Sequence, residues 1–244
     1  MINLTNELIV LSITGDDAAN FLQGQTTNDI KIIKTNEWQF SAHLNHKGRI
    51  LAIFIIYKLS DQHYLLITDK SITDNIIKRL KMFVLRSKIL ITQENYKLYF
   101  CSSDMKNIST ALENNDLVIN LDSLGNQIIL SQYVKDSSDN INIWNKYLID
   151  NKIVLINPAL EGLFIPQHIE FTGVSYTKGC YTGQEIVART HYLGKAKKSL
   201  SLVTSSQLIE IGQEISYTED DANKNSVVLN KYHGHDHYIY LICD

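Results

Sequence analysis

The sequence predicts an α+β fold of antiparallel sheets, followed by a module made of strands alone. Runs of strand-forming residues are interrupted by single helical segments, whereas a doubly wound fold would alternate strands and helices regularly. After Lys198, only short strand-like runs separated by polar turns occur. The chain has 2 prolines and no internal repeat, so no rigid linker divides it. We therefore expect a composite body over residues 1–195 and an abbreviated β-barrel-like module over residues 196–244.

The N-terminal segments predict a strand, a short helix and then a meander of strands. Residues 7–13 are mostly apolar and predict the first strand. Asp16 then caps a short helix, which Gly24 ends in the left-handed conformation. The turn His46-Lys47-Gly48 joins two of the following strands as a hairpin. These strands are predicted over residues 38–45, 49–59 and 64–68.

Four further helices are predicted among the remaining strands. Ser71 and Asp74 have the spacing of a capping box, which begins the first of these helices. Its apolar face holds Ile72, Ile76, Leu80 and Phe83. The others cover residues 108–112, residues 140–151 with Ile141, Trp144 and Leu148 on one face, and a segment that begins at Thr182. Strands are predicted over residues 88–92, 96–101, 127–131, 200–204, 214–217, 227–229 and 238–242.

The composition is that of an ordinary globular protein without general affinity for anions. Hydrophobic residues make up 44% and the formal net charge is −3, so anion binding needs a local cluster of cations. Residues 1–30 contain no basic segment followed by a long apolar stretch, and we expect a cytoplasmic protein. Three scattered cysteines, Cys101, Cys180 and Cys243, predict neither a disulfide framework nor a permanently bound metal.

The segment Lys178-Gly179-Cys180-Tyr181-Thr182-Gly183-Gln184-Glu185 predicts a reactive thiol at a helix entrance. Thr182 and Glu185 have capping-box spacing, so the free N–H groups of the helix face the loop before it. The positive helix end and the Lys178 ammonium favour the thiolate of Cys180. We therefore take Cys180 and Lys178 as the candidate catalytic residues. A tight structural turn, in which Gly179 permits an unusual backbone angle, is the alternative interpretation.

A basic strip continues from this segment. Residues 178–198 carry five cations and a single acid, Glu185, within a mildly acidic chain. The cations are Lys178, Arg189, Lys195, Lys197 and Lys198. They could bind a polyglutamate tail, a nucleotide phosphate or an RNA backbone, and a solvated basic face is the alternative.

The same segment resembles the K-G-C-Y-x-G-Q-E signature of the YgfZ family of folate-binding, GcvT-like proteins. Three other stretches agree with this family, in the same order along the chain. Residues 21–29 resemble its Q-G-Q-x-T-x-D element, residues 42–48 its A-x-H…K-G hairpin and residues 164–167 its F-I-P-Q segment. An eight-residue match with Gly, Cys, Gly and Gln at fixed places is highly specific.

The resemblance implies a fold, a cofactor and a set of partners. The expected fold is a GcvT-like body whose antiparallel sheets surround a central cavity that holds tetrahydrofolate or a derivative. The implied role is iron–sulfur cluster assembly or repair, which supports tRNA methylthiolation by iron–sulfur enzymes such as a radical methylthiolase. The expected partners are therefore folate, such enzymes and tRNA bound through Lys195, Lys197 and Lys198. We expect a monomer without membrane contact.

The resemblance also assigns the folate contacts. Trp144 aligns with a folate-contacting tryptophan, and an aromatic face can stack on a pterin. Asp150 aligns with the carboxylate that transferases use on the pterin, where it can accept two parallel N–H bonds. The alternatives are a core role for Trp144 and a surface role for Asp150. The other expected folate-binding positions are Leu8, where relatives have an aromatic residue, and Gln184, Glu185 and Arg189.

Aminomethyl transfer, in contrast, is not expected. In the transferases the segment after the hairpin glycine carries two aspartates, one of which is needed for transfer. The corresponding residues here are Ala52 and Ile53, and neither side chain can act as a carboxylate. We therefore expect no glycine-cleavage activity.

The sequence leaves three functions open: a folate-dependent accessory protein, a one-carbon transferase with an unknown donor, and an RNA- or protein-binding adaptor without catalysis. Two histidine groups are weaker signals. His43 and His46 flank the hairpin turn and could line the ligand site, or belong to an ordinary turn. His233, His235 and His237 alternate, so on one strand they would share a face that could bind a transition metal. Incidental surface histidines are the alternative.

Overall fold

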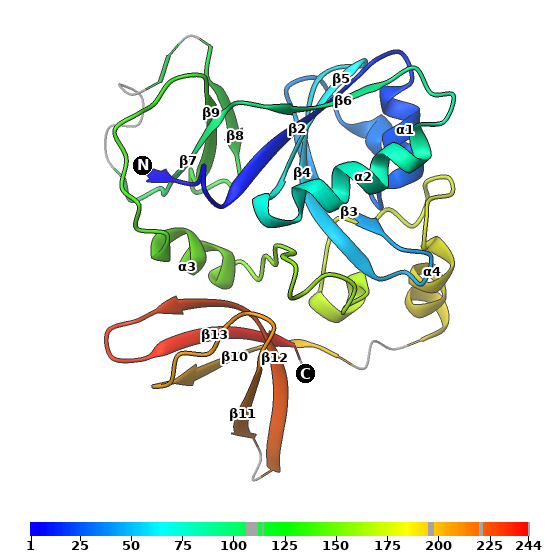
Figure 1. Ribbon diagram of the computed structural model, residues 1–244. Coiled ribbons are helices and arrows are strands. Elements are labelled where there is room, and N and C mark those ends of the chain that lie inside the picture. The colour runs from blue at the N-terminus through cyan, green and yellow to red at the C-terminus, as the bar shows by residue number, and fades with distance from the viewer. Residues whose placement is uncertain (106–111, 114, 195–197, 220–221, 244) are drawn as a thin grey trace.

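Figure 1 shows the computed structural model, in which three antiparallel sheets and their helices form three lobes. The structure describes residues 1–105, 112–113, 115–194, 198–219 and 222–243. The predicted α+β class is confirmed, because the strands pair antiparallel within each sheet and single helices interrupt them.

A five-stranded sheet forms the centre of the body. Its strands follow the order β3-β4-β5-β2-β6. They are β2 (Leu8–Thr14), β3 (Trp38–Leu44), β4 (Ile50–Ser60), β5 (His63–Asp69) and β6 (Leu90–Glu94). Two helices pack on one face, and the second sheet packs with a third helix on the other. Because β4 is covered on both faces, it carries an almost unbroken run of buried apolar residues.

Helix α1 (Ala18–Gln25) ends differently from the sequence prediction. Gly24 lies within the helix, and the chain leaves it at Thr26 in an extended conformation, with φ −129°. The Thr26 hydroxyl donates to the carbonyl of Leu22 at 2.8 Å, which satisfies a helix-end acceptor without a left-handed glycine. The N-terminal boundary also moves, because Asp17 and not Asp16 precedes the first turn.

Helix α2 (Thr73–Val84) follows a 3-10 turn at Lys70–Ile72. The predicted capping box is wrong here, because Asp69 caps the turn by accepting from the backbone N–H of Ser71 at 2.9 Å. The predicted apolar face is buried at Ile72, Ile76 and Leu80, whereas Phe83 near the end of the helix is 39% exposed.

The second sheet has the strand order β1-β7-β9-β8. Its strands are β1 (Ile2–Asn3), β7 (Lys97–Cys101), β8 (Leu117–Asn120) and β9 (Gln127–Ser131). The sequence did not predict β8, which is only 4 residues long. The predicted helix over residues 108–112 falls outside the described residues, apart from Leu112. Helix α3 (Asn142–Asp150) follows, close to its predicted bounds.

The third sheet follows the order β10-β13-β12-β11 and curls into a half-barrel with two free edges. Its strands are β10 (Leu200–Ser205), β11 (Glu214–Glu219), β12 (Ala222–His233) and β13 (Tyr238–Cys243). Asn142 of α3 holds it through two hydrogen bonds: its Nδ2 donates to the carbonyl of His233 at 2.8 Å, and its Oδ1 accepts from the His233 N–H at 2.7 Å. One apolar cluster also contains residues of both the body and this sheet, including Phe164 and Leu241. The half-barrel is therefore packed onto the body.

Candidate functional site

The signature loop runs into helix α4 (Gln184–Leu193), which begins two residues later than predicted. Gly183 is the N-cap, with φ +83°, and no side chain caps the helix, so the predicted capping box of Thr182 and Glu185 is wrong. The Gln184 side chain instead turns back, and its Oε1 accepts from the N–H of Tyr181 at 3.1 Å. Gln184 thus stabilises the loop itself, while Glu185 is exposed.

Lys178 fastens the signature loop to the end of α1. Its Nζ donates to the carbonyls of Gln23 at 2.7 Å, Thr26 at 2.7 Å and Asn28 at 2.8 Å. Burial lowers the pKa of Lys178 to about 8, against the opposing effect of the nearby Asp29 carboxylate. At neutral pH the ammonium therefore keeps three hydrogens, and each has a carbonyl acceptor. This arrangement suits a positioning role for Lys178.

Gly183 and Gly48 let the signature loop contact the β3–β4 hairpin. A Cβ at Gly183 would lie 2.5 Å from the carbonyl oxygen of Asn45 and 3.0 Å from the Cα of Gly48. Gly48 also has a positive φ of +70°, and a Cβ there would lie 2.9 Å from the Cβ of Ile186. The two motif glycines are thus required by the same close contact.

The remaining motif joins the same junction. Gln167, at the end of the F-I-P-Q segment, donates through Nε2 to the carbonyl of Val187 in α4 at 2.8 Å. Phe164 accepts from the N–H of Ile50 in β4 at 2.8 Å. Four stretches that lie far apart in the sequence therefore meet at one place. We call this place the signature junction: residues 23–28, 43–50, 164–167 and 178–187.

Cys180 is the exposed thiol of the signature junction. Cys101 and Cys243 are buried, and all three cysteines are free thiols. Among the described residues, no group of three or more His, Cys, Asp or Glu side chains could hold a metal ion. Cys180 therefore lies on a loop that several hydrogen bonds and close contacts hold in place, and its thiol is accessible to a partner.

A central cavity of about 230 Å³ lies between the five-stranded sheet, the segment after α3 and the chain before the signature loop. Its apolar walls include Phe40, Phe171 and Ile53, and the two aromatic rings are 6.5 Å apart. At its polar side, Lys152 and Glu170 form a salt bridge of 2.9 Å. Lys152 lowers the pKa of the Glu170 carboxyl, which is therefore ionised at neutral pH.

Lys152 and Glu170 also share an unusual backbone conformation. Both have positive φ angles, 52° and 50°, although neither is glycine. Such conformations cost free energy and cluster at ligand-binding positions. This supports the central cavity as a candidate ligand site.

The structure does not bring Trp144 and Asp150 together. Trp144 is 3% exposed and packs in the core against Phe100 and Tyr147, with ring centroids 4.9 Å and 5.7 Å away. A void of about 10 Å³ and a depression of about 190 Å³ border both Trp144 and Leu8. Asp150 is half-exposed and pairs with Lys146 at 2.5 Å. Neither Trp144 nor Asp150 lines the central cavity.

Comparison with known proteins agrees with this architecture. Residues 5–99 match the family model of the GCVT N-terminal domain. The tRNA-modifying protein YgfZ of Hamiltonella defensa subsp. Acyrthosiphon pisum (strain 5AT) is 28% identical over 93% of this chain and 77% of its own length. The YgfZ protein of Escherichia coli O157:H7 (strain EC4115 / EHEC) is 25% identical over 84% of this chain and 72% of its own length. These relatives confirm the resemblance to the YgfZ family.

A solved structure shows the same fold. The glycine cleavage system aminomethyltransferase T from Bartonella henselae superposes with a TM-score of 0.69, at 11% identity. The match covers 99% of this chain and 77% of that protein. The GcvT-like fold that the YgfZ resemblance implies is therefore confirmed.

Within this YgfZ-like body, Ala52 and Ile53, which the family resemblance aligns with the transferase aspartates, are buried in β4. Ile53 lines the central cavity, whereas Ala52 packs in the cluster under α1 and α2. Their exposed fractions are 1% and 0%. The wall that would need a carboxylate for aminomethyl transfer is thus hydrocarbon.

The basic strip is only partly described by the structure. Arg189 is exposed on α4 and lies 3.8 Å from Glu185, at the spacing of a weak surface pair. Lys195 and Lys197 lie outside the described residues. Lys198 places its Nζ over the ring of Phe164, 5.6 Å from the centroid. Among the described residues, none of the helices is long and apolar enough to cross a membrane.

The histidines that the sequence singled out lie in different environments. His43 is buried, and its Nδ1 donates to the carbonyl of Gln25 at 2.8 Å. Burial lowers the pKa of His43, so the ring is neutral at neutral pH. Its hydrogen bond to Gln25 stabilises the end of α1. His235 and His237 lie in the turn after β12 and not on a strand with His233. The predicted one-face alternation of these three residues is therefore wrong.

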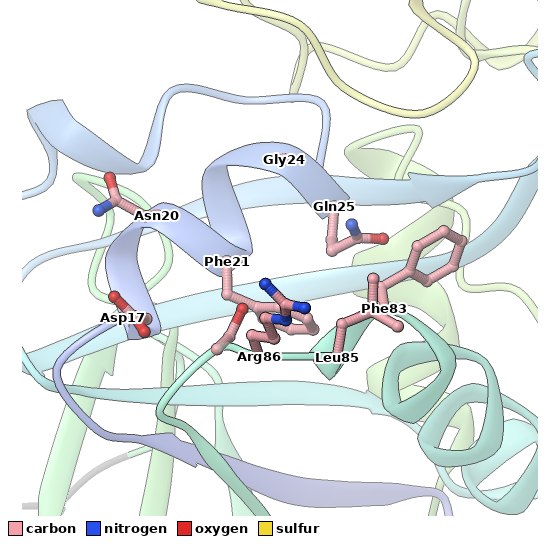
Figure 2. Close-up of a pocket in the computed structure, with 9 residues that line it drawn as sticks. Asp17, Asn20, Phe21, Gly24, Gln25, Phe83, Leu85 and Arg86 are labelled. Atoms are coloured by element: carbon pink, nitrogen blue, oxygen red, sulfur yellow. The ribbon is translucent and has the colours of Figure 1, made fainter.

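The sequence did not predict a pocket of about 820 Å³ beside the signature junction, shown in Figure 2. Helix α1 forms one wall and the chain at the end of α2 forms the other. It is lined by Asp17, Asn20, Phe21, Gly24, Gln25, Phe83, Leu85, Arg86 and Ser87. The sequence feature that marks this region is the run of five cations without an acid in residues 78–88. The residues of the central cavity's polar side, Lys152 and Glu170, carried no such signal.

Proposed function

We propose that this chain is a cytoplasmic, monomeric folate-binding accessory protein that maintains iron–sulfur enzymes and thereby supports tRNA modification. Several curated relatives are named tRNA-modifying proteins, which supports the last part of the proposal. The observation that carries it is the signature junction, where four separate motifs hold the exposed thiol of Cys180. Segment 171–173 connects this junction to the central cavity, because Phe171 lines the cavity and the carbonyl of Gly173 accepts from the hydroxyl of Thr27.

The central cavity offers the chemistry that a pterin ring requires. Phe40 and Phe171 provide aromatic walls. The Glu170 carboxylate accepts from the N–H of Leu200 at 3.2 Å and from Lys152 at 2.9 Å, and its remaining lone pairs can accept N–H bonds from an amino-pyrimidine edge. The 230 Å³ cavity is below the ~300–1,000 Å³ of sites for drug-sized ligands. It therefore suits the ring, with the rest of a folate outside. A reduced folate supplies one-carbon units or reducing equivalents, while these side chains bind it, orient it and exclude water.

Aminomethyl transfer is the less favoured function, because Ile53 presents hydrocarbon to the central cavity. The acid and base that line the cavity, Glu170 and Lys152, lie on its polar side and pair with each other, and neither replaces a carboxylate at the position of Ile53. We expect no methylenetetrahydrofolate to form from an aminomethylated lipoyl carrier. Production of methylenetetrahydrofolate in a coupled assay with purified protein would contradict this expectation.

The folate site is tested by calorimetric titration with tetrahydrofolate under anaerobic conditions. We expect Glu170→Gln to weaken binding about 10- to 100-fold, because it removes a charge-assisted acceptor worth roughly 1.5–3 kcal/mol. Asp150→Asn is the matched control, since Asp150 also pairs with a lysine but lies outside the cavity. If Asp150→Asn loses tetrahydrofolate binding and Glu170→Gln keeps it, the folate site lies at α3 and not in the central cavity. No binding by the wild type would remove folate from the proposal.

The iron–sulfur role is tested with Cys180→Ala in cells that lack the native protein. We expect lower activity of iron–sulfur enzymes and less methylthiolated tRNA, while the purified variant keeps its tetrahydrofolate affinity. The control is Cys101→Ala assayed in the same cells, because Cys101 is a buried thiol away from the junction. Full complementation by Cys180→Ala would contradict a role for this thiol.

A further inference from the structure

The pocket of Figure 2 lies against the signature junction and is separate from the central cavity. The carbonyl of Gly24, which lines the pocket, accepts from the N–H of Thr182 at 3.4 Å, two residues after Cys180. No residue lines both the pocket and the central cavity. It is an open depression of about 820 Å³, not an enclosed cavity, so it suits one part of a longer ligand.

One acceptor in the pocket wall lacks a donor. The Oε1 of Gln25 is buried and has no hydrogen-bond partner. An unpaired buried carbonyl oxygen is unfavourable, and unsatisfied groups of this kind occur where a ligand or water supplies the missing bond. Because this oxygen is buried, a ligand reaches it only when the Gln25 side chain turns outward, whereas the exposed amide of Asn20 is open to direct contact. Asn20 adds a second amide to the lining, from the other end of α1 (Figure 2).

The rest of the lining is aromatic and apolar. Phe21 and Phe83 both line the pocket, and Phe83 is 39% exposed. Leu85 is 88% exposed and has a φ of +41°, which is strained for a residue with a branched side chain. A flat ring bound here would stack on an aromatic face and cover exposed hydrocarbon.

A concentrated positive charge accompanies these features. Residues 78–88 hold five cations and no acid, in a chain of net charge −3. Arg79 pairs with Glu161 at 3.5 Å. The other four are exposed, and within the described part of the chain none of them pairs with a carboxylate: Lys78, Lys81, Arg86 and Lys88. Arg86 itself lines the pocket.

We propose that this pocket binds a base of single-stranded RNA, and that the cations of residues 78–88 contact the flanking phosphates. The proposal rests on the tRNA-directed part of the proposed function. Unpaired RNA bases are recognised by aromatic stacking and by amide hydrogen bonds to their edges, next to a cationic track for the backbone. An acidic peptide would use the cations, but it would leave the aromatic wall of Phe21 and Phe83 without a role.

The pocket is tested by fluorescence anisotropy with a short fluorescein-labelled RNA of mixed sequence, single-stranded or paired with its complement. We expect Phe83→Ala to weaken single-strand binding roughly 5- to 150-fold, which corresponds to the loss of one base–aromatic stack. The duplex should bind the wild type more weakly than the single strand. Lys31→Ala with Ile32→Ala is the control, because it removes one cation and exposed apolar surface outside the pocket and the basic run.

The salt dependence of RNA binding distinguishes the cations of residues 78–88 from the basic strip of residues 178–198. Lys78→Ala with Lys81→Ala should reduce the slope of log affinity against log salt by about 1.4, since each phosphate contact on a single strand contributes ~0.7. Changing Lys195, Lys197 and Lys198 to alanine should leave the slope unchanged. The proposal would be overturned if the changes at Lys195, Lys197 and Lys198 reduced the slope and those at Lys78 and Lys81 did not, because RNA would then bind at the basic strip.

Two other results would also overturn the proposal. One is equal affinity for duplex and single strand together with no effect of Phe83→Ala, which would indicate unspecific attraction to charge. The other is tighter binding of a polyglutamate peptide than of RNA at the same salt concentration. Neither result affects tetrahydrofolate binding at Glu170 or the Cys180→Ala phenotype, so the proposed function is judged separately.

Discussion

At the scale of single residues, Lys178 holds the signature loop through hydrogen bonds to three backbone carbonyls. The K-G-C-Y-x-G-Q-E segment marked Lys178 and Cys180, and the exposed thiol is where a partner can contact it. The role of Lys178 depends on carbonyls about 150 positions earlier in the chain, at hydrogen-bond separations of 155, 152 and 150 residues. No local pattern contains this information, because backbone carbonyls are the same in every sequence.

Lys178 provides the first stability prediction. Lys178→Met should lower the free energy of unfolding by about 2–4 kcal/mol, because one buried and two partly buried carbonyls lose a charged donor while the apolar part of the side chain is retained. The measurement is urea unfolding at neutral pH. Lys31→Met is the control, and its change should stay within about 0.5 kcal/mol, as for ordinary surface positions. Equal losses of unfolding free energy in the two variants would contradict a stabilising role for the three hydrogen bonds of Lys178.

The folate residues show the same limit. Trp144 was expected to stack on a pterin, yet its ring packs against Phe100 and Tyr147. The helical spacing of Ile141, Trp144 and Leu148 was compatible with both a core and a ligand role. Only the tertiary partners decide between these, and they come from β7 as well as from α3 itself.

At the scale of elements, periodicity predicted most strands and helices, and capping residues were the main errors. Both predicted capping boxes, at Ser71 and Thr182, do not form. In both cases a neighbouring residue takes the cap, and at α4 this is Gly183 with its positive φ. Capping-box spacing is short and common, so it identifies a helix start only to within a few residues.

The contact of α4 with the β3–β4 hairpin gives the second prediction. Gly183→Ala should destabilise the protein by about 2–5 kcal/mol, because the new Cβ would lie 2.5 Å from the Asn45 carbonyl oxygen at a φ of +83°. Gly179→Ala is a matched control in the same loop, since nothing lies within 4 Å of its Cβ position. Thermal unfolding of both variants measures the difference. Similar melting temperatures for the two would mean that the close contact does not constrain Gly183.

At the scale of the whole molecule, the change from a mixed region to strands alone predicted the separate third sheet. The sequence could not predict how that sheet sits, because its contacts with the body come from segments far apart in the chain. Phe164 and Leu241 share one apolar cluster, and Asn142 forms two hydrogen bonds with His233. A shared core of this kind makes the two parts depend on each other for burial of apolar surface.

The whole chain should consequently unfold as one cooperative unit. Trp38 and Trp144 lie in the body, so tryptophan fluorescence in urea follows the body alone, and hydrogen exchange of peptides from residues 222–243 follows the half-barrel. The two midpoints should coincide. Asn142→Ala should move both together and lower the free energy of unfolding by about 1–2 kcal/mol, through the loss of two hydrogen bonds. Asn140→Ala, at an exposed position before α3, should move neither. If residues 222–243 exchange at lower urea than the fluorescence change, the half-barrel unfolds independently and the shared core is too weak to couple it to the body.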